Sequence, residues 1–155
     1  MTAYLYRMPA GRPGHVSRRA SSTLEPGIVG AFFIPYGAPV KVVGGKFLPL
    51  ASGDDAAVIY GFMSISYPTT TYQVEGVYGA APGSQQSVLR RGYMTVALKA
   101  GASSKPASVY VRLQADNGKK VGDIEASPGN GLAVVPATFM GEADADGNVE
   151  IAYNI

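Results

Sequence analysis

Glycine and proline interrupt this chain too often for a long helix to form. The 155 residues include 20 glycines and 11 prolines, and no window of about 11 residues keeps a helical period of apolar side chains once these are counted. The segments between the interruptions are short and rich in β-branched and aromatic residues, which favour strands. Strands are predicted over residues 31–36, 40–43, 46–50, 57–64, 89–98, 108–113, 120–125, 132–139 and 149–153. The pattern predicts an all-β fold, a jelly-roll-like sandwich or small barrel.

Three dipeptides predict hairpin turns, because each tolerates the positive φ that such turns require. They are Gly44-Gly45, Asn117-Gly118 and Asp146-Gly147. The last lies in residues 144–150, where oxygen-bearing side chains at alternate positions superficially resemble a calcium loop. The glycine does not have the EF-hand spacing, so we predict a turn here and no metal.

Alternation along two of the strands predicts which side chains point inward. The inward set is Val109, Val111 and Leu113 in one strand and Met94, Val96 and Leu98 in the other. The outward set is Tyr110, Arg112 and Gln114, with Tyr93, Thr95 and Ala97.

Charge divides the chain into two parts. Residues 1–27 contain four arginines and one acid, a net charge of 4 − 1 = +3, whereas residues 28–155 contain nine basic and ten acidic residues, or −1. We therefore expect an extended basic arm, 1–27, and a single β domain, 28–155, with a long loop at 65–88. A generally basic nucleic-acid surface is not implied, and no direct nucleic-acid partner is expected.

The arm and the long loop resist the strand interpretation. Residues 8–15 contain two prolines and two glycines, so they cannot be helical. We expect a partner chain to hold the arm; the alternative is that residues 4–6 add an edge strand and the rest drapes over the domain. Tyr67, Tyr72 and Tyr78 of the loop are residues of a type enriched at interfaces. The alternative is a loop tucked on its own domain.

Residues with catalytic chemistry are few. The absence of cysteine excludes thiol nucleophiles and Cys-ligated zinc. The single histidine, His15, has no acidic neighbour before Glu25, and Asp54-Asp55 is expected to be a solvated turn. Phosphate-loop and nucleophile-elbow motifs are absent. We therefore predict no catalytic, cofactor or metal site, and a soluble chain with no membrane partner, because no apolar run reaches about 18 residues.

Several segments of the chain carry a family resemblance. Residues 1–18, 45–50, 58–63, 89–96 and 138–155 together resemble the structural cement proteins of tailed bacteriophages. The resemblance implies a jelly-roll-like domain on the outer surface of an icosahedral capsid in the virion, after synthesis in the host cytoplasm. It also implies that the domain bridges neighbouring major capsid proteins and pairs with its own copies, for which we expect a homodimer rather than a trimer.

With that role, the arm and the loop supply the expected partner contacts. The arm residues are Tyr4, Tyr6, Arg7, Arg12, Arg18 and Arg19. The tyrosines would anchor the contact, and the arginines would pair with capsid carboxylates. One alternative is a tail-associated carbohydrate- or receptor-binding domain that uses the loop tyrosines, which the absence of tryptophan disfavours. The other is an enzyme such as a glycosidase, for which no pair of carboxylates is placed.

Overall fold

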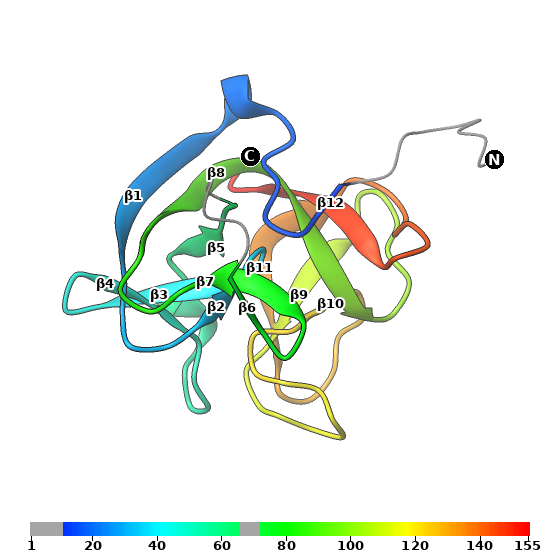
Figure 1. The fold of residues 1–155 in the computed structure, drawn as a ribbon. Coiled ribbons are helices and arrows are strands. Elements are labelled where there is room, and N and C mark those ends of the chain that lie inside the picture. Colours follow the sequence, from blue (N-terminus) through cyan, green and yellow to red (C-terminus); the bar gives the residue numbers. More distant parts are fainter. Residues whose placement is uncertain (1–10, 66–71) are drawn as a thin grey trace.

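The computed structural model describes residues 11–65 and 72–155, and this part of the chain is nearly all β (Figure 1). The first strands are β1 (Thr23–Val29), β2 (Ile34–Pro35), β3 (Pro39–Val43), β4 (Lys46–Pro49), β5 (Gly61–Met63) and β6 (Gln73–Val74). They are followed by β7 (Val77–Ala80), β8 (Gln85–Ala100), β9 (Ser108–Arg112), β10 (Ile124–Glu125), β11 (Leu132–Phe139) and β12 (Asn148–Tyr153). Two short 3₁₀ helices, η1 (Arg19–Ser21) and η2 (Ala56–Val58), complete the elements. No helix in these residues is long and apolar enough to cross a membrane.

The long strand β8 organises the larger sheet. One edge of β8 pairs first with β1 and then with β12, and the other edge pairs with β5 and then with β10. From β1 the pairings run through β4 and β3 to β5, and from β10 through β9 and β11 to β12. The nine strands of this sheet therefore close into two rings that share β8. Closure leaves few unpaired strand edges, which lowers the risk of unspecific strand addition.

Two hydrophobic clusters correspond to this double closure. Val88 and Leu89 are neighbours in β8, so their side chains point to opposite faces. Leu89 lies opposite Phe62 and belongs to one cluster, whereas Val88 lies opposite Met63 and belongs to the other. All four side chains are fully buried. A single strand thus contributes to both cores and ties the two rings into one body.

The three predicted hairpin turns are confirmed. Val43 pairs with Lys46 around Gly44-Gly45, and Asn117 adopts φ 46° in the turn between β9 and β10. In the turn before β12, the Asp144 Oδ1 accepts the backbone N–H groups of Asp146 and Asn148 at 3.0 and 2.9 Å. These bonds explain the alternating oxygen side chains as turn chemistry, and the described residues contain no cluster of three or more metal-ligating side chains.

Several predicted strand limits were wrong. Of residues 31–36 only Ile34–Pro35 is strand, of 57–64 only Gly61–Met63, and of 120–125 only Ile124–Glu125. The sequence analysis also missed β1, β6 and β7. The shortened strands still supply deeply buried residues, because burial here depends on packing between elements and not on ladder length.

Two residues expected to face outward are buried instead. Arg112 is 4% exposed, because its guanidinium pairs with the carboxylate of Glu125 on β10. Thr95 is 0% exposed, and its backbone is hydrogen-bonded to the N-terminal segment at Gly14 and His15. The predicted inward set is confirmed for Val109, Val111, Met94 and Val96, which are all fully buried.

That N-terminal segment, residues 11–17, is called the strap here. Its backbone bonds to β8: the Gly14 N–H donates to the Thr95 carbonyl at 2.8 Å, and the Thr95 N–H donates to the His15 carbonyl at 2.9 Å. Val16 pairs with Met94 in a β-bridge and is 4% exposed. The strap lies along the edge of β8 between the residues that pair with β5 and those that pair with β10. The described part of the expected arm therefore lies on its own domain, and the expected boundary at residue 27 falls inside β1.

The strap should contribute to stability. Replacing Val16 with alanine removes two buried methyl groups from the core, and we expect the free energy of unfolding to fall by about 2 kcal/mol. Urea denaturation followed by circular dichroism measures this change. Ile28→Ala, at a side chain that is 42% exposed, is the matched control. Equal effects of the two substitutions would mean that the strap is not docked in solution.

Candidate interaction surface

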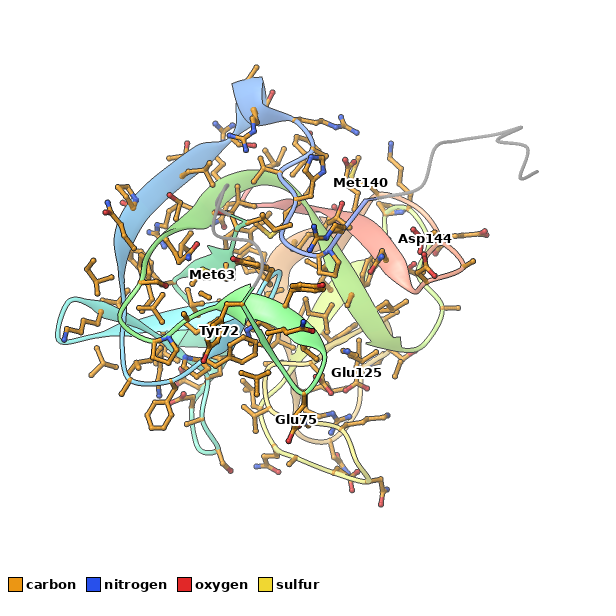
Figure 2. All side chains as sticks on the ribbon, in the orientation of Figure 1. Met63, Tyr72, Glu75, Glu125, Met140 and Asp144 are labelled. Atoms are coloured by element: carbon orange, nitrogen blue, oxygen red, sulfur yellow. The ribbon has the colours of Figure 1, made fainter. Side chains whose placement is uncertain are left out.

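The β6–β7 hairpin, within the expected loop 65–88, presents apolar side chains to solvent. Val74 lies opposite Val77, and these two side chains are 38% and 48% exposed. Tyr72 and Tyr78 are 42% and 44% exposed. The hairpin joins β2 in a small sheet of three strands, in which β6 forms an edge. Figure 2 shows Tyr72 and Glu75 on this hairpin, with Glu75 at its turn.

The hairpin borders a cavity of about 680 Å³, which we call the hairpin groove. The groove lies between β6–β7 and the segment 118–124, and its apolar lining includes Tyr36, Leu50, Val77, Tyr78, Val121 and Ile124. Burial raises the pKa of the Tyr36 phenol, an effect that the nearby Arg12 partly offsets. Tyr36 therefore stays neutral and serves as an amphipathic wall of the groove.

The groove brings together residues that the sequence analysis had singled out in two separate regions. The Arg12 guanidinium carbon of the strap lies 5.0 Å from the ring centroid of Tyr78, a cation–π contact. The ring of Tyr72 packs against Phe33, with centroids 5.9 Å apart. Tyr72 also accepts the Gly79 N–H through its carbonyl at 3.1 Å. Arg12, Tyr72 and Tyr78 thus lie on one side of the molecule, around one hairpin.

The other described arm residues lie elsewhere. The Arg18 Nη2 is 3.0 Å from the Glu150 Oε1, and its guanidinium carbon lies 4.2 Å from the ring centroid of Tyr93. Arg18 therefore already pairs with a carboxylate of its own chain. Arg19 is exposed in η1, which lies at the top of the view just before β1, well above the hairpin (Figure 1). Tyr4, Tyr6, Arg7 and Tyr67 lie outside the described residues.

The remaining candidates of the sequence analysis are the two aspartates at 54 and 55 and the single histidine. Asp54 accepts hydrogen bonds from the Lys41 Nζ and the Ala51 N–H, both at 2.7 Å, and the Lys41 bond holds its pKa below the usual range. Asp55 caps η2 by accepting the Ala57 N–H at 2.9 Å. The predicted turn is confirmed and Asp55 is exposed, but Asp54 is partly buried in an ion pair with Lys41 and is not fully solvated as expected. His15 is exposed on the strap.

Sequence reasoning missed the apolar part of this surface. The segment Val74-Glu75-Gly76-Val77 carries a hairpin signal, because two β-branched residues flank a two-residue turn ending in glycine. Glu75 obscures the signal, since it adopts φ 51° without being a usual turn residue. Phe32, which is 63% exposed, was expected inside a strand. Nothing in the sequence indicates its exposure.

Comparisons with known proteins point to one family. Residues 1–154 match the family described as "Structural cement protein (E217 gp24/Pam3 gp6)". A solved structure titled "The capsid of Myoviridae Phage XM1" contains a chain with 19% identity and a TM-score of 0.71, and the match covers 98% of this chain and 95% of that one. That likeness supports the fold. A search of curated protein sequences found no match.

Proposed function

Because the chain belongs to the structural cement proteins of phages, a family of capsid-stabilising virion proteins, we propose that it binds the outer surface of the capsid and bridges neighbouring major capsid proteins. The observation that carries this proposal is the exposed hairpin surface around Arg12, Tyr72 and Tyr78. Aromatic and arginine side chains are the residue types that dominate binding energy at interfaces.

Bridging requires contact regions on different sides of a rigid body. The hairpin surface forms one region, and the exposed η1 with Arg19 forms a second (Figure 1). The 3₁₀ helix η1 contacts β8, and the hairpin pairs with β2 in the small sheet and is followed directly by β8 along the chain. A body that contacts two subunits at once gains avidity even when each contact is weak.

The arm would supply a further contact with a neighbouring subunit. Residues 1–10 include Tyr4, Tyr6 and Arg7 and precede Gly11, whose carbonyl accepts a hydrogen bond from the Asn148 side-chain amide at the start of β12. They would anchor on a neighbouring major capsid protein or on a second cement copy, with a homodimer preferred over a trimer. The proposed role requires no catalysis. Asp54, Asp55 and Asp144 are already used in an ion pair, a cap and a turn.

The test is cosedimentation of the purified protein with matching undecorated capsids over a salt series. The arm is removed as residues 1–10 only, because Val16 belongs to the core and a longer deletion would unfold the strap. We expect the shortened protein to keep its thermal unfolding midpoint and to bind capsids about tenfold more weakly or worse, with salt-sensitive residual binding.

Two results would contradict this. Unchanged binding by the shortened protein would contradict the proposed contact of residues 1–10 but would leave the proposed capsid binding intact. Failure of the intact protein to bind would remove the proposed function itself.

A further inference from the structure

Unpaired cations gather at the hairpin groove. The described residues include twelve lysines and arginines, of which Arg18, Lys41, Arg90, Arg112 and Lys119 make ion pairs, which leaves 12 − 5 = 7 that do not. Three of these seven, Arg12, Lys99 and Lys120, line the groove. Lys99 and Lys120 are exposed, and the Arg12 guanidinium lies over the face of Tyr78.

The acids of the groove leave this positive charge only partly compensated. Asp123 and Glu75 also line it. The Asp123 Oδ2 accepts the backbone N–H of Lys120 at 2.8 Å, and Glu75 makes no ion pair within the described chain. Three cations against two acids around an apolar lining give a net charge of +1. An occupant of matching chemistry has apolar side chains for the floor and carboxylates for the rim.

We propose that the hairpin groove docks an extended apolar segment of the major capsid protein that carries carboxylate side chains, with Lys99 and Lys120 as the residues that select it. The inference rests on the proposed function, because it names the site at which the capsid is bound. The volume of about 680 Å³ lies within the range of roughly 300–1,000 Å³ found for binding clefts. Val77 and Tyr78 supply the apolar contact on the hairpin side.

The chain's own first ten residues are the competing occupant, contributed by a second copy. Residues 1–10 contain no aspartate or glutamate, and Arg7 adds a positive charge. Docking them in the groove would place a fourth cation beside Arg12, Lys99 and Lys120, and like charges in contact oppose binding. Charge complementarity therefore favours the acidic capsid segment over a second copy.

The test compares two double charge reversals of equal net change. Lys99→Glu with Lys120→Glu changes the groove, and Lys46→Glu with Lys105→Glu changes two exposed, unpaired lysines outside it. In cosedimentation with undecorated capsids at constant salt, the groove variant should bind at least about tenfold more weakly than the control variant. Val77→Asp, at an exposed site that does not support the core, should weaken binding comparably.

Each outcome decides the matter. Equal binding by both double variants would overturn the proposal that the hairpin groove is the docking site, but not the proposed capsid binding. Normal binding by Val77→Asp would have the same consequence. No binding by the intact protein would overturn the proposed function and the groove with it. A groove variant that binds capsids normally but loses self-association in sedimentation velocity would identify a second copy as the occupant and overturn the assignment to the capsid protein.

Discussion

Replacing Gly92 with alanine should lower the free energy of unfolding by about 3 kcal/mol. Gly92 adopts φ +134°, a conformation that residues with a Cβ rarely adopt, and a Cβ there would lie 2.3 Å from the Ser22 Oγ and 2.8 Å from its Cα. The position is also where β8 passes between the rings: Arg91 pairs with Thr23 of β1, and Gly92 with Tyr153 of β12. Steric conflict would therefore strain both rings together. Urea denaturation followed by circular dichroism measures the loss.

Gly53→Ala separates backbone strain from steric conflict. Gly53 also has a positive φ, +95°, but no atom lies within 4 Å of its would-be Cβ. We expect this control substitution to lower the free energy of unfolding by about 1 kcal/mol. If the two substitutions cost the same, the contact with Ser22 contributes nothing and the crossover of β8 tolerates a side chain.

Replacing Glu125 with alanine should also lower the free energy of unfolding by about 3 kcal/mol. The Glu125 carboxylate pairs with Arg112, with Oε2–Nε at 2.5 Å and Oε1–Nη2 at 3.1 Å, and both side chains are only 5% exposed. Lys119 adds a third contact at 3.3 Å. Without the carboxylate, the Arg112 cation stays buried without its partner between β9 and β10. Chemical denaturation at pH 7 measures the loss.

The same ion pair predicts a pH dependence. The hydrogen bond from Arg112 holds the pKa of the Glu125 carboxyl below its usual value, although burial opposes the shift. The unfolded chain therefore takes up the proton at higher pH than the folded chain, so the stabilisation is complete above the ordinary glutamate pKa of about 4.3. It is lost as the pH falls through the lower pKa of the folded state. The stability difference between wild type and Glu125→Gln should accordingly shrink as the pH falls.

Asp146→Asn is the control for general acid effects, since Asp146 is exposed in a turn and its side chain makes no ion pair within the described residues. Its stability difference from wild type should stay nearly constant over the same pH range. A constant difference for Glu125→Gln as well would show that the ion pair does not govern acid stability.

The strands and turns that the sequence predicted correctly are those whose signal is local. Residues 132–139 and 149–153 are rich in β-branched and aromatic residues, and Gly45 and Gly118 adopt the positive φ that their turns require. The missed β1 has no comparable signal. Proline and glycine interrupt it at Pro26 and Gly27, yet it pairs with β8 over six positions. Long-range pairing, which local propensity does not report, decided that element.

The sequence identified some residues of the candidate surface, and others became apparent only in the structure. The sequence drew attention to Arg12 and to Tyr72 and Tyr78 through their residue types, and the structure describes all three around one hairpin. Nothing in the sequence pointed to Lys99, which lies on β8, or to Lys120, which follows β9. Both line the groove only because the folded chain brings these segments together. Arg18 was expected to be free for a partner, but Glu150, which is 132 residues away in sequence, pairs with it.

The sequence by itself determined the all-β class, three hairpin turns and the family, because these depend on residue types and short spacings that survive in an unfolded chain. Only the tertiary structure decided that β8 serves two rings, that the strap completes an edge of β8, and that Arg112 points inward to Glu125. Each of these depends on contacts between residues distant in sequence. Their free energy becomes favourable only after chain closure brings the partners together, so no local pattern encodes them.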